Sequence, residues 1–428
     1  MKILFITYHF PPYNSVGAVR TSKTAKYLVE AGHEVKVLTC GNQLLPDSLS
    51  LEIPEKNVEY TPWFNINSPV SYVLGGTKQI STKGYVPSIR YFAGCTYFLG
   101  TFYRNLLNFP DGQIGWFPFA KRFGNQLIHR WKPDLIFGSA IPNTALLVAS
   151  TLSKKHNIPW VAELRDLWVD NHQWVRPAWR HFFEKKLERH VLSSASGLVT
   201  VSSPLAEILQ SKYSQPCEII TNGFDPDDYP DSPKVPSSNG VVHLVHTGQL
   251  FNHWRDPSPL FSALELMGDE AEKVRVHFFG RYLNLVREMA MKHNVSHLVQ
   301  THEPVSHIEA LRIQSEADIL LLIPGAGNKN NGVFTTKLFE YLGARRPILC
   351  VGDDGGVASN LIQGRGAGIT FNEPEGIARQ MRQWIKQKHD KGGIPHLPST
   401  VGEGYSRKEQ TDKLIRFLES CLKKSEST

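Results

Sequence analysis

A short segment in the second half of the chain contains residue types that can bind a nucleoside diphosphate. Thr335 and Thr336 stand at a predicted helix start, Lys337 follows, and Glu340 comes one helical turn later. Threonines at such a position offer a cap and backbone N–H groups to an anion, and a lysine beside them can neutralise a diphosphate. The glutamate can accept hydrogen bonds from both hydroxyls of a ribose. The alternative is a capping threonine followed by an ordinary surface lysine and glutamate.

A second candidate site follows the first predicted strand, residues 2–7. The turn-rich loop after it contains Gly17 and leads into an amphipathic stretch from Arg20 to Glu30. Open α/β sheets bind ligands beyond the carboxyl ends of their strands, and a glycine there lets a phosphate approach a helix N-terminus. A purely structural glycine turn is the other interpretation. The chain has no GxGxxG motif, which counts against a dinucleotide-dependent dehydrogenase.

Asp166 follows another predicted strand, residues 160–163. Its functional interpretation is a carboxylate that supports charge at the reacting carbon or orients an acceptor. Its structural interpretation is an ion pair with Arg165 or a helix cap. His9 also follows a strand, but a lone histidine in that position is more often structural.

The elements that position these residues alternate between β-prone runs and helical stretches, as in a doubly wound parallel sheet. The alternation predicts a first α/β domain over residues 1–223 and a second over 241–395. Between them, residues 224–240 are rich in Asp, Pro and Ser, which predicts a linker. Residues 396–428 form a C-terminal tail with a helix near 408–423 that can cross back to the first domain.

Residues 62–118 break this alternation and predict an insertion in the first domain. Its aromatic rings are interleaved with basic side chains, which suits the interface of an anionic membrane. Packing in the core of the first domain is the other explanation. The residues concerned are Trp63, Phe64, Tyr72, Tyr85, Tyr91, Phe92, Tyr97, Phe98, Phe102 and Tyr103, with Lys78, Lys83, Arg90 and Arg104.

Composition limits the classes of protein that fit. The 428 residues are 41% hydrophobic and 20% charged, which indicates a folded protein of two domains. The five scattered cysteines form neither a CxxC pair nor a zinc-type cluster, so we expect reduced thiols and no metal. A sequence without a signal peptide or a long apolar window predicts a soluble, cytoplasmic protein.

The formal net charge of +7 predicts acidic partners. No helix-turn-helix, zinc-finger or RNP-like pattern is present, so we expect no nucleic acid. Phosphorylated small molecules and an anionic membrane surface remain.

Seven elements, in order along the chain, resemble the bacterial family 4 glycosyltransferases, and most closely those that build surface polysaccharides. The linker element, residues 221–225, falls where that family passes between its domains. The elements are residues 2–6 with Gly17 and Arg20, then 32–35, 133–136, 164–168, 221–225, Gly248 with 255–257, and 337–342.

The resemblance implies the GT-B fold, an α/β architecture of two Rossmann-like domains that face each other across a cleft. It also implies a hexosyltransferase that moves a sugar from a UDP- or GDP-linked donor to a saccharide or lipid-linked acceptor, with retention of anomeric configuration. A DxD-like metal pair is missing, so the resemblance implies a metal-independent enzyme without a cofactor. A helix dipole with Arg255 and Lys337 would stabilise the leaving group instead.

Carried over residue by residue, the resemblance implies that Glu340 holds the donor ribose and that Arg255 and Lys337 contact the diphosphate. Asp166 lies where many relatives have a His or Asp near the reacting carbon. The remaining donor-binding residues implied are Gly17 near the transferred phosphate, Thr335 and Thr336 at the helix start, and Gly280, Arg281 and Glu303 near the nucleobase.

One position departs from the family pattern. The family usually has two glutamates eight positions apart, and here Gly332 stands in place of the first. The missing glutamate suggests one rival function, a non-catalytic nucleotide-sugar-binding protein. A second rival is a nucleotide-sugar 2-epimerase or hydrolase, which shares the two-domain fold and the donor pocket but needs no acceptor.

Overall fold

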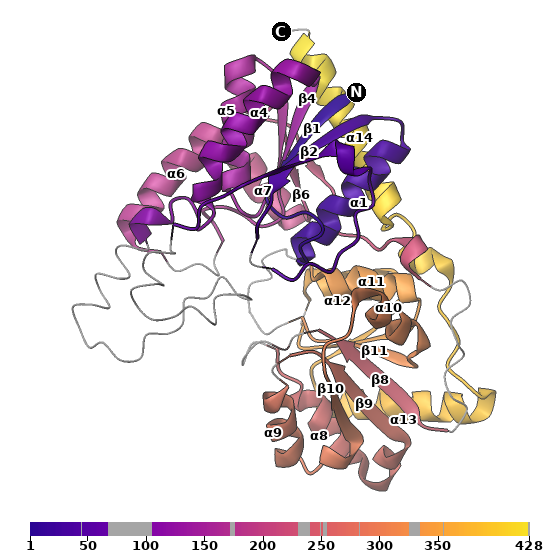
Figure 1. Cartoon of the computed structure of the whole chain (residues 1–428). Coiled ribbons are helices and arrows are strands. Elements are labelled where there is room, and N and C mark those ends of the chain that lie inside the picture. The colour runs from indigo at the N-terminus through magenta and orange to yellow at the C-terminus, as the bar shows by residue number, and fades with distance from the viewer. Residues whose placement is uncertain are drawn as a thin grey trace, which may run out of the picture. The chain divides into compact units, whose positions relative to one another are not determined.

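The chain divides into two compact units, each built on one parallel sheet (Figure 1). Unit 1 comprises Met1–Thr221 and Gln410–Thr428, and unit 2 comprises Asn222–Glu409. The computed structural model describes residues 1–43, 45–66, 105–171, 176–229, 240–248, 250, 255–281, 283–324, 334–353 and 355–426.

Unit 1 contains a seven-stranded sheet in the order β3-β2-β1-β4-β5-β6-β7. The chain order reverses between β1 and β4, which is the point where open α/β sheets bind their ligands. The strands are β1 (Lys2–Thr7), β2 (Glu34–Cys40), β3 (Val58–Thr61), β4 (Leu135–Ala140), β5 (Trp160–Leu164), β6 (Gly197–Thr200) and β7 (Cys217–Ile219). The helices are α1 (Val16–Glu30), α4 (Phe117–Trp131), α5 (Thr144–His156), α6 (Ala178–Leu192), α7 (Ser203–Lys212) and α14 (Arg407–Glu426).

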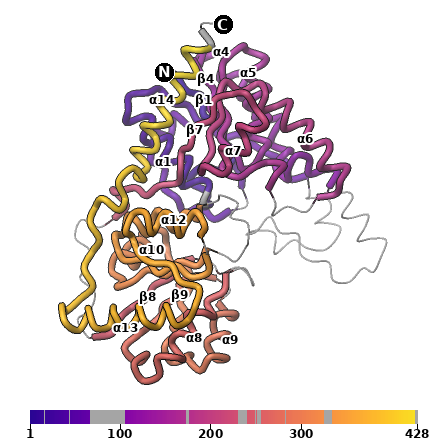
Figure 2. Tube along the Cα trace, turned by 180° about the vertical axis from the view of Figure 1, so that it is seen from behind, coloured from indigo at the N-terminus to yellow at the C-terminus, as the bar shows by residue number. Residues whose placement is uncertain are grey.

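The central strands of unit 1 are apolar throughout because helices cover both faces of the sheet. Leu4 and Ile6 face one core, and Ile3 and Phe5 face the other. The C-terminal helix α14 completes the second core, and both views of the chain show it beside this sheet (Figures 1 and 2). Gly197 permits this approach, because a Cβ atom there would lie 2.6 Å from Sγ of Cys421.

Unit 2 repeats the plan with six strands in the order β10-β9-β8-β11-β12-β13. Its switch point therefore lies between β8 and β11. The strands are β8 (Val242–Thr247), β9 (Val274–Phe279), β10 (Val299–His302), β11 (Ile319–Leu322), β12 (Ile348–Val351) and β13 (Gly368–Phe371). The helices are α8 (Ser258–Met267), α9 (Asn284–Lys292), α10 (His307–Glu316), α11 (Thr336–Ala344), α12 (Val357–Gly364) and α13 (Pro374–Lys391).

The sheets confirm the doubly wound α/β class, but one local prediction is wrong. Gly17 lies inside the first turn of α1 rather than in the loop before it. The reason is Ser15, whose side chain accepts a hydrogen bond from the backbone N–H of Ala18. This cap starts the helix at Val16, four residues before the predicted start at Arg20. Serine before an apolar stretch is a recognisable start signal.

The last residues of the predicted insertion, residues 62–118, belong to helices rather than to an irregular segment. Trp116 is fully buried in the unit 1 core, and α4 begins at Phe117. Trp63 packs partly against the same core, whereas Phe64 is exposed. The other aromatic and basic residues predicted to form the membrane surface, residues 72–104, lie outside the described residues.

Only part of the predicted linker, residues 224–240, is described. Its first residues contain the short 3-10 helix η3 (Pro226–Asp228), and Phe224 pairs with Ser406 in an isolated bridge. Among the described helices, none is both long and apolar enough to cross a membrane.

Candidate functional site

The candidate site in unit 2 is built around the N-terminus of α11. Thr335 occupies the N-cap position, but its side chain makes no capping hydrogen bond, contrary to the prediction that it caps the helix. The first N–H groups of a helix have no acceptor within it and carry partial positive charge. The helix start at Thr335 and Thr336 therefore favours an anionic ligand.

Lys337 projects its ammonium group beside the loop after β8. Gly248 makes this possible, because its φ is +117° and a Cβ atom there would lie 2.2 Å from Cε of Lys337. Burial and then the charge of Arg255 lower the pKa of Lys337 to about 8, while Glu340 opposes the shift. Within the residues that the structure describes, no hydrogen bond or ion pair holds this ammonium group.

Arg255 supplies the second cation. It stands just before α8 and is half-buried, and burial lowers the pKa of its guanidinium. Its charge acts on both Lys337 and His246. Two cations are therefore held near each other in a partly desolvated place, an arrangement that an anion would stabilise.

Glu340 is held from two sides. Nε2 of Gln314 donates to the Glu340 carboxylate at 3.3 Å and to Oγ1 of Thr247 at 2.8 Å. The hydroxyl of Tyr229 donates to the Glu340 backbone carbonyl at 2.7 Å. Gln314 is fully buried on α10, so it fixes the carboxylate from the side of the sheet.

His246 lies at the carboxyl end of β8, fully buried beside this cluster. Its Nδ1 lies 2.9 Å from the carbonyl oxygen of Leu321, which can only accept, so Nδ1 carries the proton. Burial and then the charge of Lys337 lower the pKa of His246 to about 3. The ring is therefore neutral, and among the described residues its Nε2 has no hydrogen-bond partner.

The residues predicted near a nucleobase stand at the next strand ends. Gly280 and Arg281 follow β9, Glu303 follows β10, and the backbone N–H of Gly280 donates to the carbonyl of His302 at 3.1 Å. Arg281 and Glu303 are exposed. The ring of His302 stacks on the ring of Phe279, with 4.2 Å between their centroids. The two stacked rings therefore lie at the carboxyl ends of β9 and β10, next to Gly280 and Glu303.

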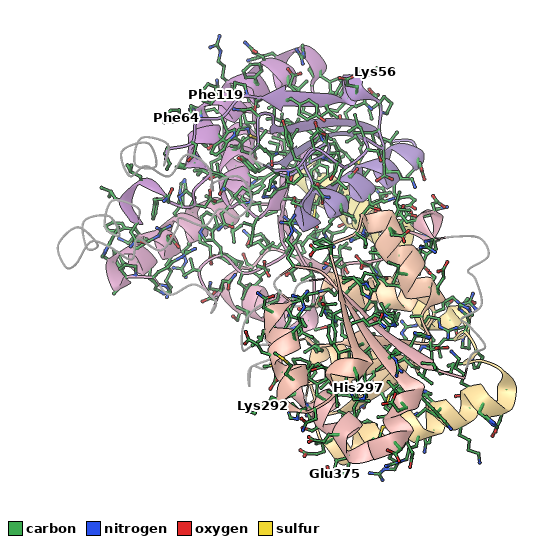
Figure 3. The ribbon with its side chains drawn as sticks, turned by 60° about the horizontal axis from the view of Figure 1, so that its bottom comes forward. Lys56, Phe64, Phe119, Lys292, His297 and Glu375 are labelled. Atoms are coloured by element: carbon green, nitrogen blue, oxygen red, sulfur yellow. The ribbon has the colours of Figure 1, made fainter. Side chains whose placement is uncertain are left out.

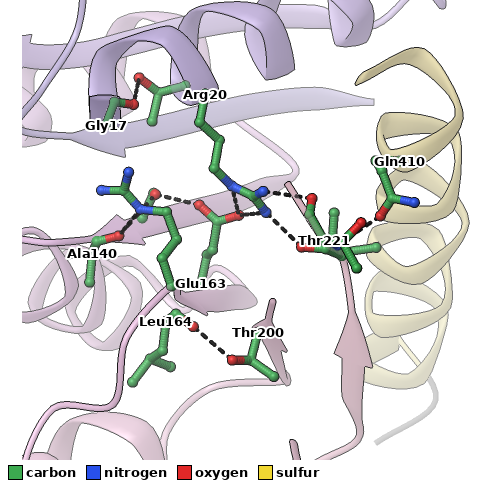
Figure 4. Close-up of polar contacts among 12 residues, drawn as sticks. Gly17, Arg20, Ala140, Glu163, Leu164, Thr200, Thr221 and Gln410 are labelled. Carbon is green, nitrogen blue, oxygen red and sulfur yellow. Dashed lines mark hydrogen bonds and ion pairs between the residues drawn. The ribbon is translucent and has the colours of Figure 1, made fainter. Parts of the chain in front are cut away.

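The corresponding edge of unit 1 contains a buried ion pair (Figure 4). Arg20 on α1 donates to the Glu163 carboxylate on β5 at 2.7 and 3.1 Å, and to the backbone carbonyls of Thr221 and Ile220. Burial alone would raise the pKa of Glu163, but the charges of Arg20 and then Arg165 lower it. The hydroxyl of Ser139 also donates to this carboxylate. Most hydrogen-bonding positions of the pair are thereby filled.

Arg165 links the two unit 1 residues predicted to act at the donor and acceptor. Its guanidinium donates to the backbone carbonyls of Ala140 and Ile141 and lies beside Gly17, where a Cβ atom would be 2.9 Å from Nη1. Burial lowers the pKa of Arg165, and the nearby Asp166 charge opposes this. Gly17 and Asp166 thus flank the same guanidinium, and Asp166 is half-buried.

His9 is also near this guanidinium. Burial and then the charge of Arg165 lower its pKa to about 4, and its Nδ1 lies 3.3 Å from Oε1 of Gln43. The ring is therefore neutral at physiological pH.

The structure gathers the predicted residues into two groups and adds several that sequence reasoning missed. Unit 2 brings together Arg255, Lys337, Glu340 and the α11 start, while Gly332 lies outside the described residues. His246 was detectable as a histidine near the carboxyl end of a predicted strand. Gln314 carries no such signal, because the contact joins residues 67 positions apart in the sequence.

Comparison with known proteins identifies the class. The family model of the glycosyl transferase 4-like domain matches residues 17–223. No curated protein sequence matches the chain.

Solved structures match nearly the whole chain at low identity. Sucrose-phosphate synthase from Thermosynechococcus elongatus has 12% identity and a TM-score of 0.61, with 100% of this chain and 98% of that chain covered. HepE from Anabaena in complex with UDP has 15% identity and a TM-score of 0.64, with 98% and 100% covered. The pneumococcal O-GlcNAc transferase GtfA in complex with UDP and GlcNAc has 12% identity and a TM-score of 0.56, with 99% of each chain covered.

At such identities the structural likeness establishes the fold alone, and the family match is limited to residues 17–223. Residues 17–223 therefore match a glycosyl transferase 4-like domain, and the chain as a whole has the GT-B fold.

Proposed function

We propose that this glycosyltransferase moves a hexose from a UDP- or GDP-linked donor to a saccharide or lipid-linked saccharide in surface polysaccharide synthesis. The observation that carries the proposal is a pair of partly desolvated cations, Arg255 and Lys337. Lys337 lies in the first turn of α11, near the Glu340 carboxylate, which accepts a hydrogen bond from Gln314. A nucleoside diphosphate offers two charged phosphates to the cations and two ribose hydroxyls to the carboxylate. UDP is the first nucleotide to test, because the HepE and GtfA structures contain it.

In this proposal, different residues bind the diphosphate, the ribose and the base of the donor. The diphosphate lies against Arg255, Lys337 and the N–H groups at Thr335 and Thr336. Glu340 accepts the ribose hydroxyls, positioned by Gln314. The base lies by the loops of Gly280, Arg281 and Glu303, where the stacked pair of His302 and Phe279 offers a flat apolar surface.

The chemistry follows from charge. The bond between the anomeric carbon and the phosphate oxygen breaks, a bond to the acceptor oxygen forms, and the departing diphosphate gains negative charge and takes the acceptor proton. Arg255, Lys337 and the helix dipole stabilise that charge without a metal ion. We propose that this step retains anomeric configuration, with Asp166 orienting the acceptor and Gly17 near the donor phosphate.

The acceptor side of the proposal includes peripheral contact with the inner leaflet of the membrane. A lipid-linked saccharide has to be presented at a bilayer surface, and a basic chain with a net charge of +7 is attracted to anionic lipid.

A donor screen by calorimetry, followed by mass spectrometry of products formed with lipid-linked acceptors, tests the function. We expect one nucleoside diphosphate to bind, and a glycosylated acceptor to form in the presence of EDTA. The reaction with donor alone is the control, because an epimerase or hydrolase would change the donor without an acceptor. Binding without any turnover would indicate a non-catalytic protein, and activity restored only by divalent ions would contradict the roles of Arg255 and Lys337.

A further inference from the structure

Helix α6 has its charged residues buried and its aromatic residues exposed. Arg180, Glu184 and Glu188 recur every four residues and are 7%, 0% and 2% exposed. Phe182 and Phe183 on the other side are 54% and 53% exposed. A surface helix of a globular protein ordinarily shows the opposite pattern, with its apolar stripe facing the core.

The buried side of α6 is held by specific polar contacts. Arg180 donates to Glu184 at 2.6 Å and to backbone carbonyls of Asn108 and Pro110, and Arg176 also pairs with Glu184. Glu188 accepts from Lys212, from the Tyr213 hydroxyl and from the backbone N–H of Val169, each at 2.7 Å. These contacts fix α6 to unit 1 without using Phe182 or Phe183.

The exposed side of α6 combines the two rings with cations. The Phe182 and Phe183 rings meet edge to face at 5.5 Å, and Nζ of Lys186 lies 4.3 Å from the Phe182 centroid. Lys185 and Arg189 are exposed on the same helix. Because both glutamates of α6 are buried and paired, every charged side chain on its exposed side is basic.

The two neighbouring helices extend this basic surface. Helices α4, α5 and α6 lie side by side in both views of the chain (Figures 1 and 2). Neither α4 nor α5 contains an aspartate or glutamate. The outer elements of unit 2 instead carry both signs, as Lys292 and Glu375 illustrate (Figure 3).

A cavity of about 440 Å³ opens where the three helices meet. Its basic lining comes from Lys121 on α4, Lys154 and Lys155 on α5, and His190 on α6, and no acidic side chain lines it among the described residues. Nζ of Lys154 lies 2.9 Å from Nε2 of His190 and 3.2 Å from the His190 carbonyl. His190 is seven residues after Phe183, which places the cavity two helical turns from the exposed rings on the same side of α6.

We infer that this surface, α4, α5 and the exposed side of α6, docks unit 1 on an anionic phospholipid bilayer. Phe182 and Phe183 enter the boundary between headgroups and acyl chains, and the cavity of Lys121, Lys154 and Lys155 receives a lipid phosphate. Charge complementarity identifies the partner, since three adjacent helices expose cations and no carboxylate. The exposed phenylalanines favour a bilayer over a nucleic-acid duplex, whose phosphate surface offers them no apolar environment.

This inference rests on the membrane contact in the proposed function, but the docking surface is separate from the donor residues, so its test can fail while donor binding and sugar transfer stand. The full chain is floated with phosphatidylcholine vesicles that contain or lack phosphatidylglycerol, at low and at high salt. Two variants, Phe182→Ser/Phe183→Ser and Lys154→Gln/Lys155→Gln, are compared with the matched control Met291→Ser/Lys292→Gln, which removes an exposed apolar residue and a lysine from α9. UDP affinity and thermal unfolding of each variant verify that the fold is unchanged.

We expect flotation only with phosphatidylglycerol, and its loss at high salt. Each lysine near an anionic surface contributes a factor of about five, so Lys154→Gln/Lys155→Gln is expected to weaken vesicle binding by more than about tenfold. The phenylalanine variant is expected to bind weakly even at low salt, and the α9 control to float like the parent. Three results would overturn the inference. The α5 and α6 variants could both float like the parent, the parent could bind neutral vesicles equally well, or it could bind duplex DNA in preference to vesicles.

Discussion

The two units present polar residues at equivalent sheet edges but balance their charge differently. In unit 1, Arg20 and Arg165 face Glu163 and Asp166, and Arg20 and Glu163 are almost fully buried and hydrogen-bonded. In unit 2, Arg255 and Glu340 act in opposite directions on the pKa of the buried Lys337, which Arg255 lowers and Glu340 raises. Internal neutrality suits a structural pair, whereas two neighbouring cations suit an anionic ligand. In the proposed function, the same fold thus uses charge for stability in one unit and for binding in the other.

The largest expected effect is on stability and concerns unit 1. Glu163→Ala leaves Arg20 buried without its carboxylate, and breaking a buried ion pair in this way costs about 3–5 kcal/mol. Urea unfolding of the isolated variant measures the loss, with the exposed-site variant Glu207→Ala on α7 as the control. UDP affinity of the remaining folded protein should not change, and a weakened affinity with intact stability would reverse the comparison.

The sign of the pH dependence follows from the lowered pKa of Glu163. A carboxylate with a folded-state pKa below its unfolded value stabilises the fold above the unfolded pKa, about 4.3 for glutamate. This contribution is lost as the pH falls through the folded-state pKa. Acid unfolding of the parent should therefore include a step that Glu163→Ala lacks.

The next effect concerns ligand binding in unit 2. Glu340→Ala removes an ionised acceptor from two ribose hydroxyls, and hydrogen bonds to charged groups contribute about 1.5–3 kcal/mol each. UDP affinity should fall tenfold or more in calorimetry, whereas Glu288→Ala on α9 should leave it unchanged. Unchanged affinity in a folded Glu340→Ala protein would remove this residue from the site.

A third effect sharpens the role of Lys337. Its pKa of about 8 in the free protein means that the ammonium is mostly charged at pH 7 and mostly neutral at pH 9. A bound diphosphate raises that pKa, so binding above pH 8 takes up a proton and UDP affinity falls as the pH rises. The expected loss between pH 7 and pH 9 is about tenfold, the limit for a single group whose pKa in the free protein is about 8. Lys337→Met should bind weakly at both pH values, and a parent protein with a flat profile would show that Lys337 does not contact the anion.

The sequence predicted part of the unit 2 group from local spacing, and Arg255 entered it only through the family resemblance. Lys337 and Glu340 are three positions apart on one helix, so helical periodicity brings them to the same end. The unit 1 pair was not predicted, because Arg20 and Glu163 are 143 residues apart and meet only once the sheet order is known. Trp116 was misassigned to an irregular insertion for a similar reason, since its indole donates to Thr61 on β3 and its ring contacts Tyr8 after β1, both distant in the sequence. Strand alternation predicted the fold, but long-range polar contacts required the structure.

The smallest expected effect separates binding from turnover at Asp166. In the proposed function this carboxylate orients the acceptor, so Asp166→Asn should leave UDP affinity unchanged and lower turnover. A single hydrogen bond contributes about 1 kcal/mol, which corresponds to a loss of about fivefold in kcat. Steady-state kinetics with a saturating donor measure it, and thermal unfolding serves as the companion measurement because Asp166 also acts on Arg165. Full turnover combined with lower stability would show that Asp166, like Glu163, belongs to the internally balanced charges of unit 1.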